Sequence, residues 1–325
     1  MENLLRLARV PVANRDADGA ISYYDGAQSG GAGIMSVTCE VALDIRAELG
    51  EGPIWDDRRE RLLFLDIMRG HIHEFNPSSG KDRIIELGRT VGCLALAERG
   101  DWIAGTSDGF YRVDPQTGRA SLLAAVEADL RDNRMNDGYV DARGRFWAGT
   151  MGMGGVRERG SLYRLDADGT VHRMLPRVSI SNGLDWSPDN RTFYFTDLAL
   201  GRIDQFDFEI NTGTIKNRRP FVEIPLDFGY PDGLIVDAEG FVWVGLWEGG
   251  SLHRYGPDGR LDRIVPVPAS QTTKCAFGGP GLTDLYVTTA NIGLDKAAKA
   301  AQPLAGALFR IRPGVRGRKP YRYAG

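Results

Sequence analysis

Short apolar runs alternate with polar turns along most of the chain. In RMNDGYVDARGRFWAGTM, from Arg134 to Met151, a polar start leads through Gly138 into an alternating segment. The turn Ala142-Arg143-Gly144 then leads into the apolar run FWAGT. Two such runs joined by a short glycine-containing turn predict a β-hairpin. A third strand is predicted in SLYRLDADG, which ends on another turn signal.

This hairpin pattern occurs six times. Its second strands follow one another at intervals of 40 to 49 residues, and they are LLFLDI from Leu62, WIAGT from Trp102, FWAGT from Phe146, FYFTD from Phe193, VWVGL from Val242 and LYVTT from Leu285. Each is followed by a third strand with its own turn. Repeats of about this length are typical of the four-stranded blades of β-propellers. We therefore predict an all-β fold, a six-bladed β-propeller of four-stranded antiparallel blades around a central channel.

The N-terminal part of the chain does not fit the repeat. Residues 1–34 are rich in Gly, Asp and Ala, which predicts a flexible N-terminal leader before a propeller catalytic domain over residues 35–325. This leader is either an upstream extension of the start site or a functional arm. The segment SVTCEVALDI, from Ser36 to Ile45, predicts a strand. We expect it to close the ring as the outer strand of the last blade, paired with the C-terminal strand near Pro320 to Tyr323.

Composition limits the class of protein. The 325 residues include 42 glycines and 16 prolines, which suits many short turns, and the formal net charge is −3. A small net charge of mixed sign argues against a nucleic-acid partner. MENLLRLARV is too short for a membrane span and lacks a signal-peptide pattern. Cys39, Cys93 and Cys275 lack metal-binding spacing, so we expect reduced thiols and a cytoplasmic protein. We also expect a monomer or a weak homo-oligomer.

Candidate chemistry lies near the start of the first strand of each blade, where the repeats align on a small residue. The six aligned positions are Glu51, Val91, Asp137, Asn182, Asp232 and Lys274. Because the innermost strands of a propeller surround its channel, these positions are expected to form a ring that faces the axis. Asp-Gly and Asn-Gly are also ordinary turn pairs, but here they open strands rather than join them.

Several acids on one axis repel one another unless a cation neutralises them. Oxygen atoms of Glu, Asp and Asn are hard ligands suited to Ca²⁺, Mg²⁺ or Mn²⁺, and three of them leave positions open for water and substrate. The four histidines fall in third or connecting strands, and Cys93 and Cys275 are expected to be packed rather than nucleophilic. The glycine-rich stretch Gly152 to Gly160 lacks the Lys-Ser/Thr of a phosphate-binding loop.

Long segments in a fixed order carry a resemblance to a known family. They are LGEGPIW, the RMNDGYVDARGRFWAGTM unit, ISNGLDWSPD, PDGLIVDAEG, CAFGG and the ending YRYAG. The chain resembles the senescence marker protein, gluconolactonase and regucalcin family of six-bladed propellers from Ser36 to Gly325. This resemblance implies hydrolysis of a sugar lactone at one divalent ion. It implies Glu51, Asn182 and Asp232 as the metal ligands, with Asp232 also the catalytic proton acceptor.

The same resemblance implies Arg134 and Asn136 as substrate-binding residues. Animal members carry acidic residues soon after the Thr-Met pair, where this chain has Gly152-Met153-Gly154. Glu158 is the candidate replacement for that substrate contact. The expected cofactor is one divalent ion among Ca²⁺, Mg²⁺, Mn²⁺, Zn²⁺ and Fe²⁺, with Ca²⁺ favoured.

The chemistry of lactone ring opening suggests a role for each of these residues. The ion is expected to polarise the lactone carbonyl and to lower the pKa of a bound water, with Asp232 taking the proton of that water. Arg134 and Asn136 are expected to hold the ring oxygens and stabilise the oxyanion. Two other classes stay open: a calcium-binding or calcium-buffering propeller without turnover, and a propeller hydrolase of the arylesterase or phosphotriesterase kind.

Overall fold

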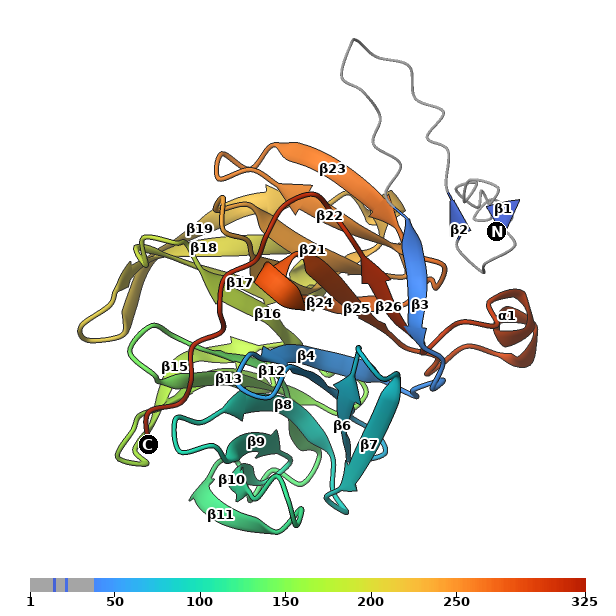
Figure 1. The fold of residues 1–325 in the computed structure, drawn as a ribbon. Helices are drawn as coiled ribbons and strands as arrows, with labels where there is room; N and C mark the ends of the chain where they lie inside the picture. Colours follow the sequence, from blue (N-terminus) through green and yellow to red (C-terminus); the bar gives the residue numbers. More distant parts are fainter. Residues whose placement is uncertain (1–13, 16–20, 23–37) are drawn as a thin grey trace.

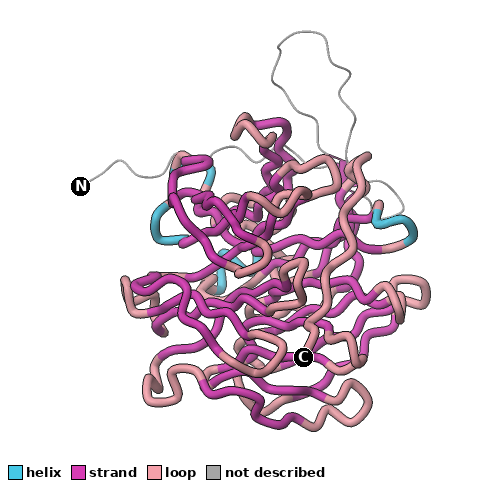
Figure 2. The backbone as a smooth tube through the Cα atoms, turned by 90° about the vertical axis from the view of Figure 1, so that its left-hand side faces the viewer, coloured by secondary structure: helices cyan, strands magenta, loops and turns pink. Residues whose placement is uncertain are grey.

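The computed structural model describes residues 14–15, 21–22 and 38–325. Within these residues the strands form six antiparallel sheets that follow one another around a common axis (Figure 1). Figure 2 shows the same arrangement from the side, with strands throughout and few helical turns. The predicted six-bladed β-propeller is confirmed. The helical segments are η1 (Leu198–Leu200), η2 (Leu226–Phe228), η3 (Pro280–Leu282) and α1 (Lys296–Ala301).

Blades one to five each consist of four consecutive strands. Blade one is β4 (Gly50–Asp56), β5 (Arg61–Asp66), β6 (His71–Asn76) and β7 (Lys81–Glu86), and blade two is β8 (Val91–Leu96), β9 (Trp102–Thr106), β10 (Gly109–Val113) and β11 (Ala120–Ala125). Blade three is β12 (Asn133–Val140), β13 (Phe146–Gly152), β14 (Gly160–Leu165) and β15 (Val171–Val178). Blade four is β16 (Ser181–Trp186), β17 (Thr192–Asp197), β18 (Arg202–Glu209) and β19 (Thr214–Glu223), and blade five is β20 (Tyr230–Val236), β21 (Val242–Trp247), β22 (Ser251–Tyr255) and β23 (Leu261–Pro266).

Blade six combines strands from the two ends of the chain. Its inner strands are β24 (Thr272–Gly278), β25 (Asp284–Thr289) and β26 (Leu308–Ile311), and β3 (Cys39–Leu43) pairs with β26 as the fourth strand. The outer strand predicted at Ser36–Ile45 is therefore confirmed. Its predicted pairing with the segment near Pro320 to Tyr323 is wrong, because that segment leaves the sheet, and Tyr323 instead bridges to Ala97 beside blade two.

Two short strands extend the sheet of blade six. They are β1 (Asn14–Arg15) and β2 (Ile21–Ser22), and Ile21 lies opposite Cys39 on β3. The remainder of the predicted leader, residues 1–34, lies outside the described residues.

Burial decreases from the channel to the rim of each blade. β4, β8, β16 and β24 are buried at every position, whereas β7 and β11 are mostly exposed. An inner strand is flanked by its own blade and by the inner strands of its neighbours, so its side chains contact protein on all sides. Polar side chains on inner strands are consequently held in a dry environment.

One turn is built in the same way in two blades. Asp141 follows β12 and accepts a hydrogen bond from Trp147 Nε1 at 2.9 Å, and Asp237 follows β20 and accepts one from Trp243 Nε1 at 2.9 Å. Each aspartate also accepts backbone N–H groups of its own turn. The tryptophans then pack between neighbouring blades, and Trp147 contacts Trp186 of blade four with ring centroids 5.7 Å apart.

The end of the chain, which we call the C-terminal strap (residues 313–325), crosses the face of the ring at which the inner strands end. The red segment that leads to the C-terminus in Figure 1 follows this path. The strap contacts each of the six blades, through hydrogen bonds to Asp56, Leu96, Gly144, Asp185, Val236 and Leu282.

Candidate metal and active site

Inner strands of the propeller contain a bulge in their first half, where two residues face one residue of the second strand. In β16 the pair Asn182-Gly183 lies opposite Thr196, and in β20 the pair Asp232-Gly233 lies opposite Gly245. The same irregularity occurs in β4, β8, β12 and β24. A bulge changes the direction of the side chain that it carries. The residue pairs that resemble turns in the sequence thus lie inside strands, at the position from which a side chain enters the channel.

Glycine is required after two of the predicted ligands. A Cβ atom on Gly183 would lie 2.1 Å from the backbone nitrogen of Leu234, and one on Gly233 would lie 2.5 Å from Cβ of Lys274. Both glycines therefore let the inner strands of neighbouring blades approach closely. This close approach brings the residues before them, Asn182 and Asp232, next to one another.

The three predicted metal ligands are brought together in the channel. Glu51, Asn182 and Asp232 are all buried. Burial, and then repulsion from Asp137, raise the pKa of Glu51 to about 8, although Lys274 opposes this shift. Burial, and then the charges of Glu51 and Asp137, raise the pKa of Asp232 well above its usual value. The carboxylates of the site therefore repel one another in a dry environment.

Open oxygen atoms show that these residues fit a cation. Asn182 Oδ1 is buried and has no hydrogen-bond partner among the described residues, and the Asn182 side chain lies close enough to Asp232 to lower the pKa of its carboxyl. An unpartnered carbonyl oxygen beside two mutually repelling carboxylates is the donor set of a hard divalent ion. Within residues 38–325 no group of three His, Cys, Asp or Glu side chains is arranged to hold a metal, so this set depends on its amide oxygen.

Arg134 and Asn136, the predicted substrate-binding pair, are in direct contact. Arg134 Nη1 donates to Asn136 Oδ1 at 2.6 Å and to the carbonyl of Met135 at 3.0 Å. Asn136 Nδ2 donates to the carbonyl of Ser181 at 2.8 Å, which fixes the amide between blades three and four. Burial lowers the pKa of Arg134 to about 10, against the attraction of Glu51 and Asp232. Its Nε atom is buried and has no partner among the described residues.

Glu158 lies apart from that pair. It is exposed in the loop between β13 and β14, where its backbone N–H donates to Ser179 Oγ at 3.2 Å. The loop is on the face that carries Arg134, because Gly152 at the end of β13 pairs with Asn133 at the start of β12. No hydrogen bond or ion pair among the described residues joins Glu158 to Arg134, and its role in substrate binding stays a prediction.

Lys274, which the repeat alignment also places in the ring, spans the channel. Its Nζ atom donates to Asp137 Oδ1 at 2.5 Å, although the two residues belong to blades six and three. Burial alone would lower the pKa of Lys274, but Asp137 and Glu51 shift it upward overall. The ammonium group is therefore charged in the interior.

The remaining nucleophilic and basic side chains are engaged elsewhere. Cys93 and Cys275 are buried, as expected, and burial raises the pKa of both thiols. His73 Nδ1 lies 2.6 Å from Asp82 Oδ2. His253 is also buried; its Nδ1 lies 2.9 Å from the Tyr255 hydroxyl, and burial lowers its pKa to about 4.

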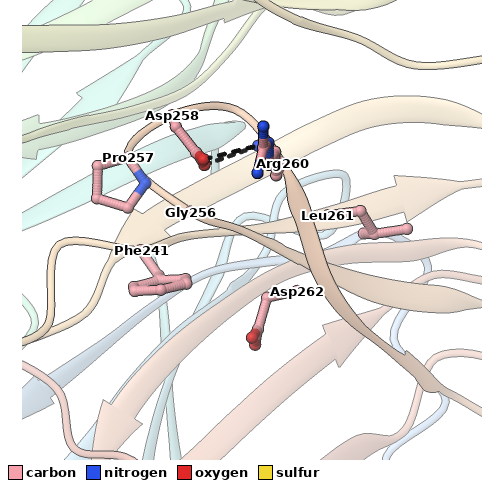
Figure 3. A pocket seen from close by; sticks show the side chains of 7 residues that line it. All are labelled: Phe241, Gly256, Pro257, Asp258, Arg260, Leu261 and Asp262. Carbon is pink, nitrogen blue, oxygen red and sulfur yellow. Dashed lines mark hydrogen bonds and ion pairs between the residues drawn. The ribbon is translucent and has the colours of Figure 1, made fainter. Parts of the chain in front are cut away.

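A surface hollow of about 410 Å³ lies away from the channel, at the turn between β22 and β23 (Figure 3). It contains none of the predicted site residues. Asp262 in its wall is already paired with Arg254 at 2.9 Å. The hollow is lined by Phe241, Gly256, Pro257, Asp258, Arg260, Leu261 and Asp262.

The chain is a six-bladed propeller whose channel is lined by buried carboxylate and amide oxygen atoms. Residues 49–291 match the family model described as the SMP-30/gluconolactonase/LRE-like region, and the chain belongs to this family. The family membership predicted from the sequence is thus confirmed. The family description covers lactonase proteins, and regucalcins are among the relatives.

Three relatives illustrate the match. Regucalcin of Sus scrofa is 38% identical over 299 residues, which cover 90% of this chain and 100% of the relative. The crystal structure of a calcium-binding protein, regucalcin from Agrobacterium tumefaciens strain C58, is 32% identical with a TM-score of 0.84 over 88% of this chain and 97% of that one. A luciferin-regenerating enzyme is 29% identical with a TM-score of 0.82, over 89% and 100% of the two chains. Among the described residues, no helix is both long and apolar enough to cross a membrane.

Proposed function

We propose that this protein hydrolyses a sugar lactone, an aldonolactone, to the corresponding aldonic acid with the help of one divalent ion, Ca²⁺ being favoured. The ion would be held by Glu51, Asn182 and Asp232. The observation that carries the proposal is the unpartnered, buried Oδ1 of Asn182 next to Asp232, whose pKa is raised by burial and then by the charge of Glu51. The family description, which includes gluconolactonase, supports the reaction class.

A divalent ion bound by these oxygens would supply Lewis acidity toward a carbonyl oxygen. Asp232 accepts a proton from the attacking water as a general base. The water oxygen forms a bond to the carbonyl carbon, and the bond from that carbon to the ring oxygen breaks. The proton held by Asp232 passes to the departing ring oxygen, which becomes the hydroxyl of the acid.

Arg134 holds the substrate while this exchange occurs. Its Nη1 is occupied by Asn136 and Met135, whereas its Nε has no partner among the described residues. A guanidinium with an unused donor in a dry site stabilises negative charge that develops on an oxygen. Asn136 fixes the orientation of that guanidinium through its own bond to Ser181.

The face around the channel mouth favours a second candidate, the hydrolysis of an ester or lactone that has an apolar portion. Three segments on this face, the β13–β14 loop, η1 and η2, expose apolar side chains. Phe228 of η2 is 41% exposed and packs edge-on against His253 with ring centroids 5.1 Å apart. The exposed apolar side chains are Met153, Val156, Leu200, Leu226 and Phe228.

A panel of substrates tests these candidates together. Purified protein is stripped of metal with a chelator, reconstituted with Ca²⁺, Mg²⁺, Mn²⁺ or Zn²⁺, and assayed on aldonolactones, an alkyl-substituted lactone, phenyl acetate and a phosphotriester. The proposal expects turnover of aldonolactones that disappears on chelation and returns with added ion. Preference for phenyl acetate would favour the apolar ester. Calcium binding without turnover of any member would favour a binding protein. Full lactonase activity in protein shown by elemental analysis to be metal-free would contradict the metal site.

A further inference from the structure

The ammonium group of Lys274 is a positive charge inside the channel. The stem of Lys274 passes over Gly233, whose missing side chain leaves the space for it, since a Cβ there would lie within 2.8 Å of Lys274 Cβ, Cγ and Cδ. The ammonium group ends on Asp137 Oδ1 of the opposite blade and lies 5.7 Å from the centre of the Tyr139 ring. Both charged groups are buried, so this pair is not a surface salt bridge.

Asp137 is an incompletely satisfied anion. Its Oδ1 accepts from Lys274 and from the N–H of Gly138 at 2.7 Å. Its Oδ2 is buried and has no partner among the described residues, and the residue is 1% exposed. A buried carboxylate oxygen without a donor is expensive unless a positive charge lies close by. Asp137 is therefore placed as a ligand of a cation would be, and the ammonium group of Lys274 lies where that cation would bind.

The charges in the channel support the same interpretation. Three carboxylates, those of Glu51, Asp137 and Asp232, affect one another electrostatically in the dry ring. Pairing with Lys274 neutralises the charge of Asp137. The two carboxylates that remain, Glu51 and Asp232, are both predicted ligands of the single divalent ion.

We propose that the Lys274 ammonium group fills a second cation site of the channel, formed at Asp137, and thereby restricts the channel to one exchangeable divalent ion. Replacing Lys274 with a neutral residue opens that site to a cation from solution. The expectation that the parent protein binds one ion rests on the metal site of the proposed function. The expectation that a second site opens at Asp137 when Lys274 is neutralised does not depend on that function.

Calcium binding to three variants of the full chain tests this inference. Chelator-treated parent protein, Lys274→Met, Asp137→Asn and the double variant are titrated with CaCl₂ by calorimetry, and bound calcium is counted by elemental analysis after gel filtration. Methionine has nearly the length of lysine without its charge. We expect Lys274→Met to bind one more calcium ion than the parent, and the double variant to lose that additional ion.

Asp137→Asn alone provides a second test that does not require Lys274→Met to fold. It leaves the ammonium group unpaired beside Glu51 and Asp232, so we expect calcium to bind about tenfold more weakly or worse than in the parent. Lys274→Gln replaces Lys274→Met if circular dichroism shows that the methionine variant is unfolded. An unchanged number of ions in the folded neutral variant, together with unchanged affinity in Asp137→Asn, would overturn the inference and leave Lys274 a structural strut. A parent that binds no calcium beside a Lys274 variant that binds one would support the inference and contradict the proposed function.

Discussion

Arg318 Nη2 donates to Asp185 Oδ1 across 2.9 Å, which ties the C-terminal strap to the inner strand of blade four. The same nitrogen donates to the carbonyl of Trp186 at 2.8 Å, and Nε donates to the carbonyl of Val236 on blade five at 3.1 Å. Asp185 Oδ2 in turn accepts from the N–H of Val236 at 2.7 Å. One arginine thus joins the strap to two neighbouring blades at the end of the channel opposite to the metal site.

Arg318→Ala is expected to destabilise the protein by about 2 to 4 kcal/mol, because it leaves a buried carboxylate without its cation. Urea denaturation followed by tryptophan fluorescence measures this difference. Arg316→Ala is the matched control: its side chain is exposed, and only its backbone carbonyl bonds to Ala238. Equal unfolding free energies for the two variants would show that the strap is held by its backbone alone.

The part of the fold that is repeated was predictable from the sequence. Strands recur with the same turn chemistry, as in the Asp141 and Asp237 turns, and the glycine after each ligand marks the bulge that aligns the ring. The path of the strap was not predictable, because its contacts depend on single arginines such as Arg318 that have no repeat partner. The sequence also did not indicate that Lys274 pairs with Asp137, since only three-dimensional placement selects one carboxylate among several.

Closure of the ring by β3 leads to a comparison of two deletions. Removing residues 1–37 retains β3, whereas removing residues 1–43 leaves β26 as an unpaired edge and removes the partner of Arg310, Glu40 at 2.9 Å. We expect the longer deletion to lower the melting temperature and to promote aggregation, relative to the shorter one. Thermal denaturation with light scattering measures both effects. Identical melting and scattering for the two forms would contradict the role of β3 in closing the ring.

Stability is expected to depend on pH through His253. Its folded pKa of about 4 lies below its ordinary value of 6.5, because burial disfavours the charged form. The contribution of neutral His253 to the free energy of unfolding is fully present above pH 6.5. It is lost as the pH falls from 6.5 toward 4, because over this range the unfolded chain binds a proton at His253 and the folded chain does not. The loss is on the order of 3 kcal/mol. His253→Gln should show a shallower decrease of unfolding free energy between pH 6.5 and 4 than the parent, and equal slopes would remove His253 as the cause.

Asp232→Asn separates the base from the ligand. Asparagine keeps an oxygen that can bind the ion but removes the charge and the proton acceptor, so we expect kcat to fall by about 10² to 10⁴ at saturating metal. Metal occupancy, measured by elemental analysis, should fall less. The residual rate should rise with pH as hydroxide replaces the water that Asp232 deprotonates. A variant as active as the parent at neutral pH with the ion bound would exclude Asp232 as the base.

Arg134→Ala addresses substrate binding, because this residue contacts Asn136 rather than the predicted ligands. The variant removes the free Nε donor and also leaves Asn136 Oδ1 without its donor at 2.6 Å. We expect kcat/KM on an aldonolactone to fall. The loss of transition-state stabilisation should be about 2 to 4 kcal/mol, the range for losing a group that stabilises an oxyanion in a dry site. Calcium should still bind, and more tightly than in the parent, because a positive charge near Glu51 and Asp232 has been removed.

Two controls make the Arg134 result specific. Arg159→Ala removes an exposed arginine from the same face of the ring, where it pairs with Asp132 at 3.4 Å, and it should leave kcat/KM unchanged. Arg134→Lys keeps the charge but loses the planar fork, so it should recover calcium affinity of the parent without recovering kcat/KM. If Arg134→Lys restores both, a point charge is sufficient at this position and the directed guanidinium bond is not needed. If Arg134→Ala weakens calcium binding instead, Arg134 supports the metal site, and substrate recognition has to be assigned to other residues of the channel mouth.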